Sequence, residues 1–253
     1  MNNTAHAPKP SPPVPIDLLI EARWIIPIEP ANVTLEDYAL AIDQGNIIAL
    51  LPQAEARTRF APRETVLLPN HILMPGLVNL HTHAAMTLLR GLADDLPLME
   101  WLKNHIWPAE AKHVSPQFVY DGTRLACAEM LQGGITCFND MYFFPKAAAE
   151  AALHAGIRAS IGLVTMEFST AYATDADDYL DKGMTVRDQL RDETLLSFCL
   201  APHAPYTVSD QSFVRILTLS EQCHLPIHLH LHETAQEITD AEKQYGQRPL
   251  ERL

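Results

Sequence analysis

The stretch MPGLVNLHTH, residues 74–83, decides the fold of this chain. It opens on Pro75 and Gly76, which break helices, and continues as an apolar run that ends at His81 and His83. In a β-strand, residues two apart point to the same side, so both imidazoles face one way at the strand end. Such a pair can share one metal ion. The alternative is a pair of surface histidines at the start of a loop.

Outward from this stretch, toward the C-terminus, short apolar runs alternate with helical segments. We expect strands at residues 72–80, 135–141, 158–164, 195–201 and 226–232. Between them we expect helices at residues 117–132, 146–155, 175–191 and 209–223, the first with Ser115 and Pro116 at its start. Strand–helix alternation of this kind predicts a parallel sheet with right-handed crossovers.

Polar residues stand where these strands end, which favours a barrel. They are His81 and His83, then Asp140, His203 and residues 230–233. A β/α barrel gathers its chemistry at the carboxyl ends of its strands. An open doubly wound sheet is the alternative, but no GxGxxG motif follows a strand to support dinucleotide binding. We therefore predict an α/β chain whose residues 71–253 form a partial (β/α)8 TIM-type barrel of about five strands, truncated because a complete barrel needs eight.

The N-terminal residues have a different sequence pattern, without the alternation of strands and helices. Residues 16–70 contain short β-like runs with a hairpin turn at Asp43–Asn46, and they predict part of a small β-sandwich domain. Residues 1–15 are polar and rich in proline, which predicts a disordered arm and not a secretion signal.

Composition argues against several classes of function. The net charge of −13 disfavours a nucleic-acid binder, which needs a basic surface for phosphates. No run of about 18 apolar residues is present, so we expect no membrane partner. The four cysteines form no CxxC pair, so we expect plain thiols in a reducing, cytoplasmic compartment and no cysteine zinc site. The composition leaves open whether the protein forms a homo-oligomer.

A second histidine cluster, His228-Leu-His230-Leu-His232, ends beside Glu233. Alternation puts all three imidazoles on one side of a strand, but only the top of that strand reaches a barrel's site. We expect His228 to pack inside the barrel, and at least one of His230 and His232 to contact metal or substrate. Glu233 is either a general base and acid beside a metal-activated water or a glutamate that favours a helix N-terminus.

Three further residues are weaker candidates. His203 follows a strand between two prolines and is a metal ligand, a substrate contact or a loop histidine. By residue type alone, Trp101 is more typical of a core and Glu110 of a solvated surface.

Four segments together resemble the amidohydrolase superfamily. They are MPGLVNLHTHAAMTLLRGLADDLPLMEWL (74–102), LQGGITCFNDMYFFP (131–145), APHAPYTVS (201–209) and HLHLHETAQE (228–237). The likeness is strongest to the triazine-hydrolase-related branch, which includes the 5'-methylthioadenosine/S-adenosylhomocysteine deaminases. It implies a metal-dependent hydrolytic deaminase of purine nucleosides that releases ammonia. Guanine deaminase and triazine chlorohydrolase activities of the same branch stay open as alternatives.

The resemblance also implies roles for single residues. His81, His83 and His230 match the ligands of one divalent metal ion, for which we expect Zn²⁺, and Glu233 matches the glutamate that carries the proton. Substrate contacts are implied for His203, for Glu110 at the ribose hydroxyls, for Trp101 as an aromatic wall, and for Glu233 itself.

Some features of the branch have no counterpart here. A metal-binding aspartate from the eighth strand and a histidine from the sixth find no position before Leu253. An arginine that some relatives carry after the third strand is missing from IGLVTMEFS (161–169), and Glu167 is the candidate to replace its contact. We therefore expect the active site of this chain to be incomplete, with little or no activity unless the remaining strands are supplied. The rival interpretation is an inactive fragment that binds zinc weakly.

Overall fold

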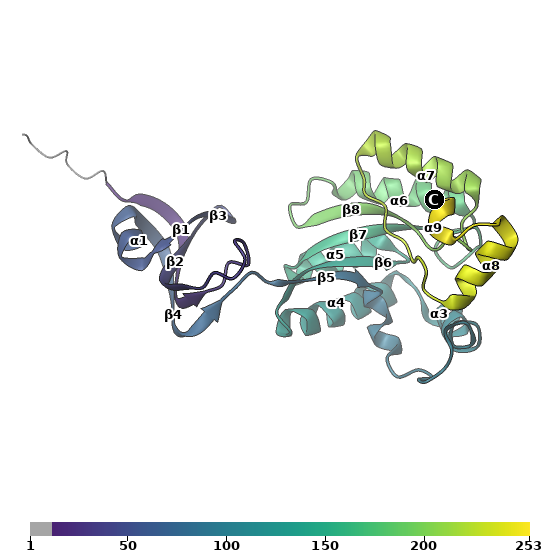
Figure 1. Cartoon of the computed structure of the whole chain (residues 1–253), viewed down its shortest axis with the longest axis horizontal. Coiled ribbons are helices and arrows are strands. Elements are labelled where there is room, and N and C mark those ends of the chain that lie inside the picture. The colour runs from purple at the N-terminus through teal and green to yellow at the C-terminus, as the bar shows by residue number, and fades with distance from the viewer. Residues whose placement is uncertain (1–11) are drawn as a thin grey trace, which may run out of the picture. The chain divides into compact units, whose positions relative to one another are not determined.

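The computed structural model describes residues 12–253, and the chain divides into two compact units, Met1–Pro75 and Gly76–Leu253 (Figure 1). Most of the predicted disordered arm falls on residues 1–11, outside the described residues. The predicted arm is too long at its end, because Val14 and Pro15 belong to the first strand. Each unit has its own hydrophobic core.

The N-terminal unit is a four-stranded sheet with one short helix. Its elements are β1 (Val14–Ile25), β2 (Leu35–Asp43), β3 (Asn46–Pro52), α1 (Gln53–Arg59) and β4 (Phe60–Leu73), and the strand order is β3-β2-β1-β4. The predicted hairpin joins β2 to β3 through Gln44 and Gly45, both at positive φ as a two-residue turn requires. Residues 12–75 contain a single sheet, so the second layer of a sandwich is absent from this part of the chain.

The C-terminal unit contains a parallel sheet in the order β5-β6-β7-β8. Its strands are β5 (Leu77–Thr82), β6 (Ile135–Tyr142), β7 (Arg158–Thr165) and β8 (Leu196–Pro202). The prediction of an α/β chain with a parallel sheet is confirmed. The first predicted strand was too long, because residues 72 and 73 end β4 in the N-terminal unit.

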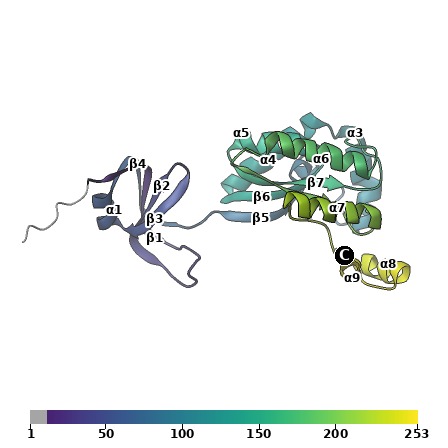
Figure 2. The ribbon, with the colours of Figure 1, turned by 90° about the horizontal axis from the view of Figure 1, so that it is seen from above.

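Helices connect the strands and run alongside the sheet (Figure 2). After β5 come η1 (Ala84–Leu89), α2 (Leu98–Trp101), the π-helical turn η2 (Leu102–Ile106), α3 (Trp107–His113) and α4 (Pro116–Gln132). The later helices are α5 (Pro145–Ala155), α6 (Ala176–Leu190), α7 (Asp210–Cys223), α8 (Ala235–Tyr245) and α9 (Pro249–Arg252). Ser115 caps α4 by accepting a hydrogen bond from the Phe118 amide, and Ser209 caps α7 in the same way. Within residues 12–253, no helix has the length and apolar character that crossing a membrane requires.

The predicted fifth strand, residues 226–232, forms only one β-bridge, between Leu200 and Ile227. The Leu200 amide donates to the carbonyl of Pro226, and its carbonyl accepts from the amide of His228, both at 2.9 Å. The next donor along β8 in a parallel ladder would be residue 202, which is a proline without an N–H. The segment therefore lies beside β8 but is not a continuous strand.

Candidate metal centre and adjoining cavity

Three imidazoles meet at the carboxyl end of the parallel sheet. His81 lies in β5, His83 follows it, and His230 lies in the extended segment beside β8. One ring nitrogen from each histidine lies within 4.8 Å of the others. The Nε2 atoms of His83 and His230 are 3.1 Å apart. These are the three residues that the sequence predicted as candidate ligands.

Backbone carbonyls orient two of these rings. His83 donates from Nδ1 to the carbonyl of Met141 at 2.6 Å, and His230 donates from Nδ1 to the carbonyl of His203 at 2.7 Å. A carbonyl acceptor on Nδ1 fixes the proton there and leaves the lone pair on Nε2. Both Nε2 atoms therefore face the centre of the cluster as electron-pair donors.

This donor set fits a divalent cation. The Nε2 atoms of His83 and His230 face each other as two acceptors without a proton between them, an unfavourable contact that a cation would relieve. Two nitrogen ligands of a tetrahedral zinc ion, each at about 2.0–2.1 Å, would lie about 3.3 Å apart, close to the observed separation. Burial, the largest cause, lowers the pKa of His83 to about 4, so this ring is neutral and able to ligate at pH 7.

His228 orients the third ring. Its Nε2 lies 2.8 Å from Nδ1 of His81, so one of the two rings donates to the other. Burial, and secondarily the neighbouring His230, lowers the pKa of His228. The sequence had suggested only interior packing for His228. The structure gives it a hydrogen-bond partner in the histidine cluster.

Asp140, at the end of β6, holds the turn that follows His81. Its Oδ1 accepts from the Ala84 amide at 2.7 Å and from the Thr82 hydroxyl at 3.0 Å. The side chain is buried, and desolvation raises its pKa to about 6 in spite of these donors. The carboxylate thus ties β5 and the start of η1 to β6, and it sets the direction in which His83 leaves the strand.

A cavity of about 640 Å³ opens beside the three imidazoles. His83, His203 and His230 line it, together with apolar side chains that include Met166 and Phe168. The volume lies within the usual range for small-molecule sites. The ring centroids of His203 and His230 are 5.0 Å apart, and the Nδ1 of His203 is 3.0 Å from the Thr207 hydroxyl. Burial lowers the pKa of His203 to about 3, so this ring is neutral at pH 7.

Glu110 and Trp101 lie on the wall of the same cavity. By residue type alone, Glu110 was expected on the solvated surface and Trp101 in the core. Tyr142 donates from its hydroxyl to Oε1 of Glu110 at 2.7 Å. Burial raises the pKa of Glu110, and the Tyr142 hydrogen bond opposes that rise. Trp101 donates from its indole nitrogen to the carbonyl of Leu92 at 3.0 Å, which fixes the ring against the loop before α2.

Glu233 also lines the cavity, at the start of the turn into α8. Glu237 accepts from the amide of Glu233 at 2.7 Å and from the amide of His232 at 3.2 Å. Among residues 12–253 the Glu233 carboxylate takes part in no hydrogen bond or ion pair, so it is available to a ligand. His232 is at φ 56° and its ring accepts from the Leu250 amide at 3.3 Å, so it turns away from the three imidazoles.

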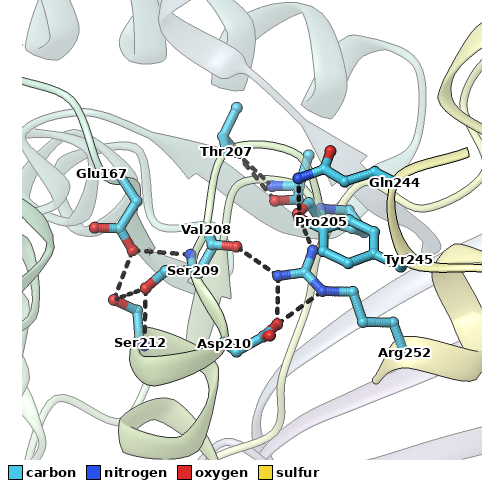
Figure 3. Close-up of polar contacts among 11 residues, drawn as sticks. Glu167, Pro205, Thr207, Val208, Ser209, Asp210, Ser212, Gln244, Tyr245 and Arg252 are labelled. Atoms are coloured by element: carbon cyan, nitrogen blue, oxygen red, sulfur yellow. Dashed lines mark hydrogen bonds and ion pairs between the residues drawn. The ribbon is translucent and has the colours of Figure 1, made fainter. Parts of the chain in front are cut away.

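Glu167 does not take the role suggested for it. Its Oε1 accepts from the Ser209 amide at 2.8 Å and from the Ser212 hydroxyl at 2.7 Å (Figure 3). It is absent from the described wall of the cavity. The carboxylate caps the first turn of α7, where unpaired amides favour a negative charge.

Sequence reasoning missed the residues that support this site. Asp140 lies near the end of the predicted strand 135–141 and Tyr142 follows that strand, but the sequence predicts no site role for either of them or for Glu237. A signal was present for the first two, because both stand at the strand end where a β/α sheet gathers its chemistry. Glu237 is the third residue after Thr234, the spacing of a helix cap, which suggests a local function only.

Comparisons with known proteins agree with this geometry. Residues 72–253 match the Amidohydrolase family. The chain is 52% identical over 239 residues to a 5-methylthioadenosine/S-adenosylhomocysteine deaminase from Saccharophagus degradans, covering 94% of this chain and 54% of that protein. It thus spans about half the length of the curated relatives it matches.

Solved structures give the same result. An adenosine deaminase from Xanthomonas campestris with bound zinc superposes with a TM-score of 0.92 at 56% identity, over 95% of this chain and 55% of that one. An atrazine chlorohydrolase from Arthrobacter aurescens shares the fold, with a TM-score of 0.83 at 21% identity over 93% of this chain and 57% of that one. The chain belongs to the amidohydrolase family.

Proposed function

We propose that this protein is a metal-dependent hydrolytic deaminase of adenosine-type nucleosides. The observation that carries the proposal is the convergence of three imidazole nitrogens within 4.8 Å beside a 640 Å³ cavity that Glu233 and Glu110 also line. The relatives at 52% and 46% identity are named 5-methylthioadenosine/S-adenosylhomocysteine deaminases, which supports the same reaction and the same class of substrate.

His81, His83 and His230 would hold one divalent cation, for which we propose Zn²⁺. When bound, such an ion would lower the pKa of water toward neutrality and so supply hydroxide for attack on a ring carbon at neutral pH. Glu233 would accept the water's proton and deliver it to the departing amine, since its carboxylate is unpaired within residues 12–253 and lines the cavity. His203 is neutral at pH 7 and would position the purine ring by a hydrogen bond.

The far part of the cavity would hold the sugar. Glu110 would accept hydrogen bonds from two ribose hydroxyls, and Tyr142 fixes its carboxylate for that purpose. Among the described residues no lysine or arginine lines the cavity, and the walls near Met166 and Phe168 are apolar. These walls favour an uncharged 5' substituent such as methylthio over one that carries a carboxylate.

The fold around this site would be part of a (β/α)8 barrel, with residues 16–70 contributing to a smaller β domain. The parallel order β5-β6-β7-β8 and the likeness to the zinc-bound deaminase support the barrel. We propose a small-molecule substrate as the partner, and neither a nucleic acid nor a membrane.

The test is ammonia release by the purified, zinc-loaded full-length protein. We expect turnover of 5'-methylthioadenosine and S-adenosylhomocysteine, with the first preferred, and little turnover of guanine. No ammonia from either adenosine compound would overturn the proposal. Chloride release from a chlorotriazine would favour the chlorohydrolase alternative, for which the shared fold is the only support.

A further inference from the structure

The loop between β8 and α7, residues 203–209, borders the site without being part of a regular element. It begins at His203, whose carbonyl accepts from both the amide and Nδ1 of His230, at 3.1 and 2.7 Å. It continues through Tyr206, which lines the cavity. The position of this loop therefore sets the position of one candidate metal ligand.

Thr207, in the second half of this loop, is hydrogen-bonded back to the start of the loop. Its hydroxyl accepts from the Ala204 amide at 3.1 Å and lies 3.0 Å from Nδ1 of His203. A shift of the loop at Thr207 would move the imidazole of His203 and its carbonyl together, because the two bonds join the same hydroxyl to consecutive residues.

Arg252 of α9 holds the backbone on both sides of Thr207 (Figure 3). Its guanidinium donates to the carbonyl of Pro205 and, at 3.2 Å, to the carbonyl of Val208. Its Nε and Nη2 also donate to Oδ1 of Asp210 at 2.8 and 2.6 Å.

The guanidinium is enclosed as well as hydrogen-bonded. Its central carbon lies 4.4 Å from the ring centre of Tyr245 and 5.6 Å from that of Phe213. The side chain is 7% exposed, whereas its partner Asp210 is 76% exposed. An ion pair with so exposed a carboxylate contributes little, so the bonds to the buried backbone carbonyls are the more important contacts.

We propose that Arg252 is a positioning residue of the metal centre. It holds the loop through the carbonyls of Pro205 and Val208, and the loop, through the carbonyl of His203, holds the ring of His230. This inference rests on the proposed metal site. Lysine cannot replace arginine in this role, because one ammonium group cannot reach two carbonyls and a carboxylate as the planar fork does.

The test compares Arg252→Lys with the unchanged chain in two measurements made without substrate. Hydrogen–deuterium exchange of the peptide that covers residues 203–209 reports loop order. Competition with a coloured chelator reports the Kd for Zn²⁺. We expect faster exchange in the loop and a Kd about tenfold weaker, the lower end of the effect of residues that orient metal ligands. Asp210→Ala, which leaves both carbonyl bonds in place, should change the Kd far less.

Arg57→Lys is the matched control. Arg57 donates from Nε and Nη2 to Glu21 at 2.8 and 2.6 Å, the same donor atoms and distances as in the Arg252–Asp210 pair, but in the N-terminal unit. Arg57→Lys should lower the free energy of unfolding of the protein without changing its Kd for Zn²⁺.

Two outcomes would overturn the inference, and they are distinguishable. If the unchanged chain binds Zn²⁺ and Arg252→Lys binds it equally well, Arg252 only stabilises α9 and the proposed function stands. If the unchanged chain binds no Zn²⁺, the proposed metal centre fails and the inference fails with it. Circular dichroism of each variant excludes loss of the fold as the cause.

Discussion

Replacing Asp140 with asparagine tests how a buried carboxylate supports the turn between β5 and η1. Asparagine keeps the volume and one oxygen acceptor for the Ala84 amide and the Thr82 hydroxyl, but it carries no charge. The hydrogen bonds therefore largely persist in the variant. The change in stability then reports the free-energy cost of burying the carboxylate charge.

The size of this cost follows from the pKa. Desolvation raises the pKa of Asp140 from 3.8 to about 6, and one pKa unit is equivalent to about 1.4 kcal/mol, so the full effect is about 3 kcal/mol. Between these two values the folded protein binds more protons than the unfolded chain. The contribution of Asp140 to the free energy of unfolding therefore falls as the pH rises from about 4 to above 6. Asp140→Asn removes this dependence.

The assay is urea unfolding of the metal-free protein at pH 4 to 7.5, followed by far-UV circular dichroism, for both proteins. His83 and His203, whose lowered pKa values of about 4 and about 3 destabilise the fold at acid pH, contribute equally to both proteins and cancel in the difference. The free energy of unfolding of the variant minus that of the unchanged protein should rise by about 2.5 kcal/mol between pH 4 and 7.5. A difference that does not depend on pH would refute the reasoning, because Asp140 would then titrate alike in the folded and unfolded states.

Further predictions concern the cavity and its metal. Glu233→Gln should lower kcat for deamination by about 10²–10⁴-fold and leave the Kd for Zn²⁺ unchanged, and a weaker Kd would identify Glu233 as a ligand instead. Glu110→Gln should raise KM about 10–100-fold for nucleosides but not for a free purine base, as measured by ammonia release. Zinc at 100 times its Kd should stabilise the protein by about 2.7 kcal/mol in thermal unfolding, and a chelator should abolish the gain. Gly122→Ala should cost about 1–3 kcal/mol in urea unfolding, because a Cβ would lie 2.4 Å from the Ala85 carbonyl oxygen, whereas Gly133→Ala, with its nearest contact at 3.4 Å, should cost less.

Tertiary contacts overrode two local predictions. The run at residues 226–232 has the apolar alternation of a strand, yet its pairing stops where Pro202 offers no donor to it. Glu167 stands after a strand, where a substrate contact is plausible, yet its carboxylate turns to the first turn of α7. In both cases the deciding partner lies on another element, and a local pattern contains no information about it.

The sequence by itself determined the parallel sheet, the helix starts at Ser115 and Ser209, and the pair His81 and His83 at a strand end. Periodicity of two or 3.6 residues and capping chemistry are local properties, so a single sequence expresses them. The identity of the third imidazole is not local, because alternation treats His228, His230 and His232 alike.

The family resemblance implied His230, and the tertiary structure shows how the three histidines differ. His230 faces His83, His228 faces His81, and His232, at positive φ, turns toward the Leu250 amide. Which of them reaches the centre depends on the register of the segment 226–232 against β8 and on the position of the His203 carbonyl. That position is set by the contact of His203 with His230, 27 residues away, and by the contact of Pro205 with Arg252, 47 residues away. No periodicity in the sequence encodes such separations.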